Sequence, residues 1–160
     1  MKCIFCEIVA GREPASVIYS DDQVLALMTL RPSQPGECMV IPKQHIDHFT
    51  DLSDDLSAHL VVVAQRIGRK MKQVFSPQRI GMVVHGFGVP HAHLLLVAQH
   101  NPDDITSGRF ARIEEGKIVF DLRDIPVPPR DELDKHAALL SIADEPDQGS
   151  QPPPDEAVHR

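Results

Sequence analysis

The 160-residue sequence contains no tryptophan and a single tyrosine, so few aromatic side chains are available for stacking on nucleic-acid bases. Its formal net charge of −7 also argues against binding to the phosphate backbone of a nucleic acid. No apolar run reaches the roughly 18 residues of a membrane span, and the first residues lack the long apolar segment of a signal peptide. We therefore expect a cytoplasmic protein that binds neither nucleic acid nor a membrane.

Cysteine is also scarce, but two of the three cysteines, Cys3 and Cys6, stand at Cys-x-x-Cys spacing. In a reducing compartment this spacing indicates metal or redox chemistry more often than a structural disulfide. Two thiolates do not complete a tetrahedral zinc site, and no second cysteine pair exists, so histidines would have to supply the other ligands. A redox motif is expected between a strand and a helix, whereas this one precedes every predicted strand. Zinc is favoured, while redox chemistry and two inert thiols remain open alternatives.

The most distinctive stretch of the sequence is residues 82–97, where a glycine-bearing turn separates two apolar runs. The second run opens with His91 and His93. In an extended strand, residues two apart project from the same face, about 6–7 Å from each other, so one face would carry both imidazoles. Leaving a buried ring nitrogen unpaired costs about 1–3 kcal/mol, so both histidines need partners. This pair favours either a metal site or two hydrogen-bonded core histidines.

The apolar pattern predicts an α+β fold, with an antiparallel sheet of about five strands and one long helix packed on it. We expect the strands at residues 17–20, 23–28, 37–41, 80–85 and 91–98. A short helix is expected at residues 7–10. Apolar residues recur at three- and four-residue steps between residues 53 and 75, which predicts the long helix with Ser53 as its N-cap.

The remainder of the chain changes character after residue 100. Residues 101–143 are predicted to form an extension that packs on the first 100 residues, with a hairpin over residues 109–121 and a helix over residues 131–142. Proline, aspartate, glutamine and serine dominate after residue 143. Because such a composition does not pack a core, we expect residues 144–160 to be a disordered tail.

Three motifs now stand in order along the chain: Cys3-Ile4-Phe5-Cys6, the segment Val40-Ile41-Pro42-Lys43-Gln44-His45-Ile46, and His91-Ala92-His93. Together they resemble the histidine-triad (HIT) family of nucleotide hydrolases and transferases. The resemblance covers about residues 1–100, which would be a HIT-like catalytic domain. It implies a homodimer formed through the long helix and a sheet edge. The implied substrates are nucleoside phosphoramidates, dinucleoside polyphosphates and nucleotidyl sugars.

The resemblance also implies a role for individual residues. His93 would attack the α-phosphorus and form a nucleotidyl-histidine, which water hydrolyses or another acceptor takes. Family members with an N-terminal Cys-x-x-Cys hold a zinc ion with those cysteines and two histidines. Carried over to this chain, the ligands of a structural zinc would be Cys3, Cys6, His45 and His91.

The sequence departs from the family pattern at two places. Leu95 replaces the third histidine of the motif, which removes a charge-assisted hydrogen bond worth about 1.5–3 kcal/mol. The loop before His91 is short, and the substrate site would have to be rebuilt from His85 and the backbone amides of Gly86 and Gly88.

The sequence therefore leads to three hypotheses. The first is a nucleotidyl hydrolase or transferase that cleaves at the α-phosphate through His93. The second is a catalytically weakened HIT-fold module that binds nucleotides or a partner. The third is a hydrolase in which zinc activates water directly, which requires an open coordination position.

Overall fold

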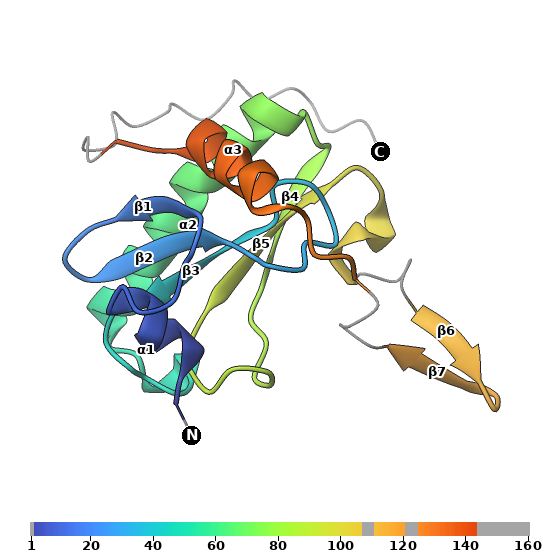
Figure 1. The fold of residues 1–160 in the computed structure, drawn as a ribbon, viewed down its shortest axis with the longest axis horizontal. Helices are drawn as coiled ribbons and strands as arrows, with labels where there is room; N and C mark the ends of the chain where they lie inside the picture. The colour runs from blue at the N-terminus through green and yellow to red at the C-terminus, as the bar shows by residue number, and fades with distance from the viewer. Residues whose placement is uncertain (1, 107–110, 121–124, 144–160) are drawn as a thin grey trace, which may run out of the picture.

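A five-stranded antiparallel sheet forms the centre of the protein in this computed structural model, which describes residues 2–106, 111–120 and 125–143 (Figure 1). The spatial order of the strands is β1-β2-β3-β5-β4, so β1 and β4 are the edges. The strands are β1 (Val17–Ser20), β2 (Val24–Met28), β3 (Cys38–Pro42), β4 (Arg79–Val83) and β5 (Leu94–Gln99). The predicted α+β fold with five antiparallel strands is confirmed.

The long predicted helix is α2 (Asp54–Phe75), which covers one face of the sheet. The Ser53 hydroxyl accepts a hydrogen bond from the Leu56 amide at 3.3 Å, as expected of an N-cap. The buried residues of the helix follow the predicted apolar stripe and pack into the core: Leu60, Val63, Ala64, Ile67, Gly68 and Met71. Helix and N-cap are both as predicted from the sequence.

Both faces of the sheet are covered, which explains why every residue of β2 is buried. Val24, Ala26 and Met28 point into the core shared with α2, because side chains alternate along a strand. Leu25 and Leu27 point to the other face. There they join Phe5 of α1 (Ile4–Val9) in a second, smaller cluster. The face that α1 covers is where the candidate site lies.

The segment between β4 and β5 differs from the prediction. β4 ends at Val83 and β5 begins at Leu94, so His91 and His93 lie directly before the strand and not within it. The reason is a different pairing of the backbone: the His91 amide bonds to the Val89 carbonyl within a turn, and the Ala92 amide donates to the Ile46 carbonyl at 2.7 Å. The first helix also begins earlier than predicted, at Ile4 and not at residue 7.

The chain after β5 forms further elements: η2 (Pro102–Thr106), β6 (Ala111–Glu114), β7 (Lys117–Phe120) and α3 (Arg130–Leu140). The predicted hairpin is present as β6 paired with β7, and the predicted helix is α3. Leu133, Ala137 and Leu140 of α3 pack into the same core as α2. The predicted tail, residues 144–160, lies outside the described residues.

Within the described ranges, none of the helices has the length and apolar character that crossing a membrane requires.

Candidate functional site

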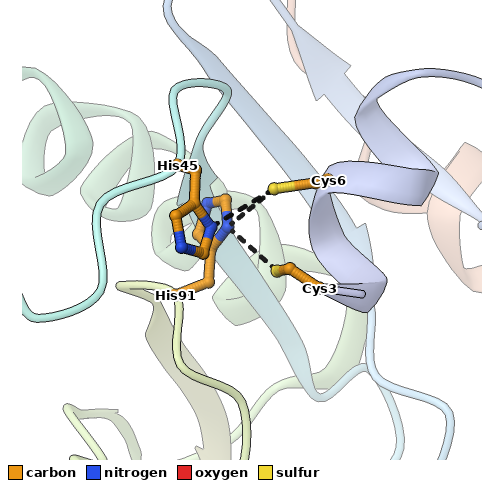
Figure 2. A group of neighbouring side chains, drawn as sticks. All are labelled: Cys3, Cys6, His45 and His91. Atoms are coloured by element: carbon orange, nitrogen blue, oxygen red, sulfur yellow. Dashed lines mark hydrogen bonds between the residues drawn. The ribbon is translucent and has the colours of Figure 1, made fainter. Parts of the chain in front are cut away.

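The four residues expected to bind zinc lie side by side at one end of the sheet (Figure 2). Cys3 and Cys6 belong to the start of α1, His45 to the segment after β3, and His91 to the segment before β5. Each contributes one potential ligand atom, and these atoms all lie within 4.8 Å of one another. Because β3 and β5 are neighbours in the sheet, the fold brings together residues that are far apart in the chain.

The distances within this cluster are those of metal ligands. The Cys3 Sγ atom lies 3.4 Å from His91 Nδ1, and the Cys6 Sγ atom lies 3.3 Å from His45 Nδ1 and 3.7 Å from His91 Nδ1. Zinc–sulfur bonds of about 2.3 Å and zinc–nitrogen bonds of about 2.05 Å at the tetrahedral angle separate sulfur from nitrogen by about 3.6 Å. Two thiols and two imidazoles are also a donor set that suits zinc. The geometry and the chemistry of these residues therefore fit a tetrahedral zinc ion.

His91 is fully buried, and its hydrogen bonds define its tautomer. Its Nε2 atom lies 2.8 Å from the Pro42 carbonyl oxygen, which can only accept, so Nε2 carries the proton. Nδ1 is left with the lone pair and faces both sulfur atoms. Burial lowers the pKa of His91, the bond to Pro42 opposes this change, and His45 lowers the pKa further. The neutral form with a free Nδ1 is the form that binds a metal.

The charge of the two cysteines also favours a bound metal. Burial and the neighbouring Cys3 thiol raise the pKa of Cys6. Two adjacent thiolates repel each other unless a cation lies between them. The described part of the chain offers Arg12 near this pair, but its guanidinium forms an ion pair with Glu7 at 2.7 Å. A metal cation is the group that would stabilise both thiolates together.

His93 lies two residues beyond His91 and is half-buried. Its Nδ1 atom lies 2.8 Å from the His91 carbonyl oxygen, so Nδ1 carries the proton and Nε2 carries the lone pair. The imidazole packs edge-on against the Phe5 ring at a centroid distance of 5.7 Å. His91 packs against the same ring at 5.5 Å. The ring of His93 is thus held in one orientation with a nucleophilic nitrogen available.

The three residues expected to contact substrate, His85, Gly86 and Gly88, lie in the exposed loop between β4 and β5. Gly88 has a φ angle of 107°, which a residue with a side chain rarely adopts. The same loop carries Phe87, whose side chain is 95% exposed. The loop leads directly into the segment of His91 and His93.

Leu95, the residue expected at the third motif position, lies on the same side of β5 as the candidate site. Its neighbours Leu94 and Leu96 point into the core under α2, so Leu95 points to the opposite face. It is half-buried and pairs with Met39 on β3 and Val83 on β4. It donates no hydrogen bond to a substrate.

The position of His48 could not be predicted from the sequence. It forms the N-cap of η1 (Phe49–Asp51), and its Nδ1 atom accepts a hydrogen bond from the Thr50 amide at 3.5 Å. Its Nε2 atom lies 3.4 Å from the place where a Cβ atom on Gly86 would stand. The one signal in the sequence is its position three residues after His45, in the segment that follows β3.

Comparison with known proteins finds a matching family and similar structures. The HIT domain family matches residues 10–101. An uncharacterized HIT-like protein of Saccharolobus solfataricus is 29% identical over 125 residues, which cover 74% of this chain and 90% of that protein. The crystal structure of a zinc-bound histidine triad family protein of Mycobacterium smegmatis is similar with a TM-score of 0.65 and 28% identity, over 88% of this chain and 91% of that chain. The bifunctional bis(5'-adenosyl)-triphosphatase/adenylylsulfatase of Arabidopsis thaliana is 26% identical over 144 residues, covering 87% of this chain and 77% of that protein.

Proposed function

The chain belongs to the HIT domain family, and we propose that it is a nucleotidyl hydrolase or transferase that cleaves nucleotide derivatives at the α-phosphate through His93. The observation that carries the proposal is the hydrogen bond from His93 Nδ1 to the His91 carbonyl, because it leaves the Nε2 lone pair available to attack phosphorus. The name of the Arabidopsis relative, a bis(5'-adenosyl)-triphosphatase, supports a substrate with a nucleotidyl group.

The reaction divides into two displacements at the α-phosphorus. In the first, His93 Nε2 forms a bond to phosphorus, the bond from phosphorus to the leaving group breaks, and the leaving group departs with that electron pair. The His91 carbonyl keeps its hydrogen bond to Nδ1–H and so stabilises the positive charge of the substituted imidazole. In the second, the oxygen of water or of another acceptor bonds to phosphorus and its proton is released to solvent. The phosphorus–nitrogen bond breaks, its electron pair returns to Nε2, and neutral His93 is restored. Phosphoramidates, dinucleoside polyphosphates and nucleotidyl sugars all allow this sequence.

We further propose that a structural zinc ion is held by Cys3, Cys6, His45 and His91. When bound, zinc supplies the positive charge that stabilises both thiolates and joins α1 to the two segments that carry the histidines. Four protein ligands leave no open position for a water molecule, which argues against the hypothesis of a zinc-activated water. His91 would link the two sites, since its ring faces the metal cluster while its carbonyl orients His93. Both cysteines must stay reduced, which supports the expected cytoplasmic location.

The alternative of a HIT-fold module that binds nucleotides or a partner without turnover is favoured by one feature. Leu95 donates nothing at a position where a histidine would contact the scissile phosphate, and loss of such a bond costs about one to two powers of ten in rate. A slowed enzyme and a module differ in a measurable way, because only the enzyme forms a covalent intermediate.

The decisive experiment measures the mass of the intact protein after mixing with bis(5'-adenosyl) triphosphate, an adenosine phosphoramidate or a nucleotidyl sugar, together with product formation. We expect wild-type protein to form a nucleotidyl adduct and products. His93→Ala should form neither, while its affinity for AMP stays within about threefold of wild type, because packing around the ring supplies little of the binding energy. His100→Ala, at the far end of β5, is the control and should behave as wild type. Binding of AMP by wild type without adduct or product would support the module.

We also propose a homodimer formed through α2 and the β4 edge. A groove of about 430 Å³ lies between these elements and is lined by residues such as Val61, Ile80 and Met82. Val61 is 44% exposed, Val62 is 45% exposed and Met82 is 49% exposed, which is a high exposure for neighbouring large apolar residues. Among the strands that the structure describes, β4 is also an edge, so a strand neighbour covers it on one side only. A second copy of the chain, related by a two-fold axis, would cover both features.

A further inference from the structure

We propose that His48 donates to the substrate phosphate the hydrogen bond that Leu95 cannot supply. The inference rests on the proposed function, since it assigns a residue to the phosphate site of that reaction. It adds a donor from a different segment of the chain, the one that follows β3, in place of the third histidine of the motif on β5.

The hydrogen bonds of His48 leave its Nε2 proton available. The Thr50 backbone amide can only donate, so His48 Nδ1 must be the acceptor. The Thr50 hydroxyl oxygen lies 2.9 Å from the same nitrogen and 3.4 Å from an Asp51 carboxylate oxygen, so its one proton can go to either acceptor. In a neutral imidazole the proton then resides on Nε2, which is a hydrogen-bond donor. No partner for Nε2 is present among the described residues, and the ring is only partly buried.

The Nε2 atom lies against the loop that leads to the nucleophile. A Cβ atom added at Gly86 would lie 3.4 Å from His48 Nε2, so the glycine leaves room between the ring and the loop backbone. The two segments are also joined beside the nucleophile, where the Ala92 amide donates to the Ile46 carbonyl at 2.7 Å. Figure 1 shows both segments at the same end of the sheet, near α1. His48 therefore lies against the loop that leads into the segment of His93.

The ring of His48 is also held in place, as a preorganised donor has to be. Phe49 packs on it with a centroid distance of 4.9 Å and an interplanar angle of 42°. The contacts to Thr50 fix the other side of the ring. A donor with a fixed orientation loses little freedom when an anion binds, so its hydrogen bond contributes more to catalysis than that of a mobile side chain. The backbone amides of Gly86 and Gly88 can add further donors to the same anion.

Replacing His48 by asparagine or by glutamine distinguishes a phosphate contact from capping of η1. Asparagine places its carbonyl oxygen where His48 Nδ1 lies and keeps the cap on Thr50, but it is too short to reach the Nε2 position. Glutamine reaches that position with its NH2 group. We expect His48→Asn to lower kcat/KM for bis(5'-adenosyl) triphosphate by about 10- to 100-fold, the value of one charge-assisted hydrogen bond. His48→Gln should stay within about fivefold of wild type. The reverse order, with Asn active and Gln impaired, would show that only the cap matters and would overturn the proposal.

Binding measurements make the result independent of turnover. The affinity for AMP relative to adenosine reports the phosphate contact alone, and His48→Asn should reduce that ratio by about tenfold while His48→Gln preserves it. His100→Asn serves as the control, because His100 is an exposed histidine at the opposite end of β5. Absence of turnover and adduct in wild type would refute the proposed function. Normal turnover in wild type with unchanged kcat/KM and AMP ratio in His48→Asn would refute only the role of His48.

Discussion

Replacing both Cys3 and Cys6 by alanine should remove the metal and destabilise the protein in two separable ways. The first arises at His91, which is fully buried. Once the sulfur atoms are gone, its Nδ1 atom contacts neither solvent nor the partners that it has in the wild type. A buried nitrogen that loses its partners costs about 1–3 kcal/mol. The second is the loss of linkage, because a metal that binds only the folded protein at 100 times its Kd adds about 2.7 kcal/mol.

The two contributions add up to a loss of about 4–6 kcal/mol in the free energy of unfolding. At about 4 °C per kcal/mol for a chain of this length, the melting temperature should fall by roughly 15–25 °C. Chelation of wild-type protein removes only the linkage, so it should account for about half of this decrease. Thermal denaturation of wild type with zinc, wild type with chelator, and the double variant measures both contributions.

Metal analysis of the same samples tests the ligands themselves. Wild type should contain about one zinc ion per chain and the double variant none, following the four-ligand requirement. Cys38→Ala is the matched control, because Cys38 is fully buried in the core under α2 and burial raises the pKa of its thiol, so it should keep its zinc. A double variant that retains zinc, or one that loses it without a change in melting temperature, would refute the assignment.

Three further predictions follow from the same structure. Leu95→His should raise kcat/KM by about 10- to 100-fold in the His48→Asn background but by less than about threefold in wild type, and equal gains in both backgrounds would show that the two positions do not share one phosphate contact. Met82→Glu should convert a dimer into a monomer of 17.8 kDa in sedimentation experiments, whereas a monomeric wild type would refute the proposed interface. Burial raises the pKa of Asp21, but hydrogen bonds outweigh this effect and lower it from 3.8 to about 2. The donors are the amides of Val24 and Gln23 and the side chains of His59 and Tyr19. Asp21→Asn should therefore lose about 2 kcal/mol of stability at neutral pH. Because the folded-state pKa is the lower one, this difference is complete above about pH 4 and should disappear as the pH falls to about 2, as acid denaturation monitored by circular dichroism would reveal.

The sequence predicted most of the fold because the apolar pattern is strong where the core is. The stripe from Leu60 to Met71 requires a helix with one buried face, and Ser53 supplies the cap that begins it. In β2 apolar and polar residues do not alternate, because both faces of the strand are buried. The apolar run is nevertheless short and ends at a turn, which is typical of a strand. The prediction of a strand over residues 91–98 was wrong at its start, because the His91 and Ala92 amides bond to Val89 and Ile46 in place of the neighbouring strand. Such pairing depends on tertiary contacts that a local pattern does not contain.

In the candidate site, too, some residues could be predicted from the sequence and others could not. Cys3, Cys6, His45 and His91 could be grouped from the sequence because their motifs resemble those of HIT family members that hold zinc, and the structure brings the four residues together. His48 could not, because nothing in its neighbours distinguishes a histidine that caps η1 from one that also reaches a loop 38 residues further along the chain. The structure adds the two facts on which its proposed role rests: the acceptor state of its Nδ1 atom and the closeness of its Nε2 atom to Gly86. A chain with Leu95 in place of the third motif histidine still needs a donor for a phosphate oxygen if it is an enzyme, and this donor can come from any segment beside the phosphate. The test of His48 therefore also distinguishes two consequences of the change at Leu95. Either catalysis was lost, or the phosphate contact is now made by the segment that follows β3.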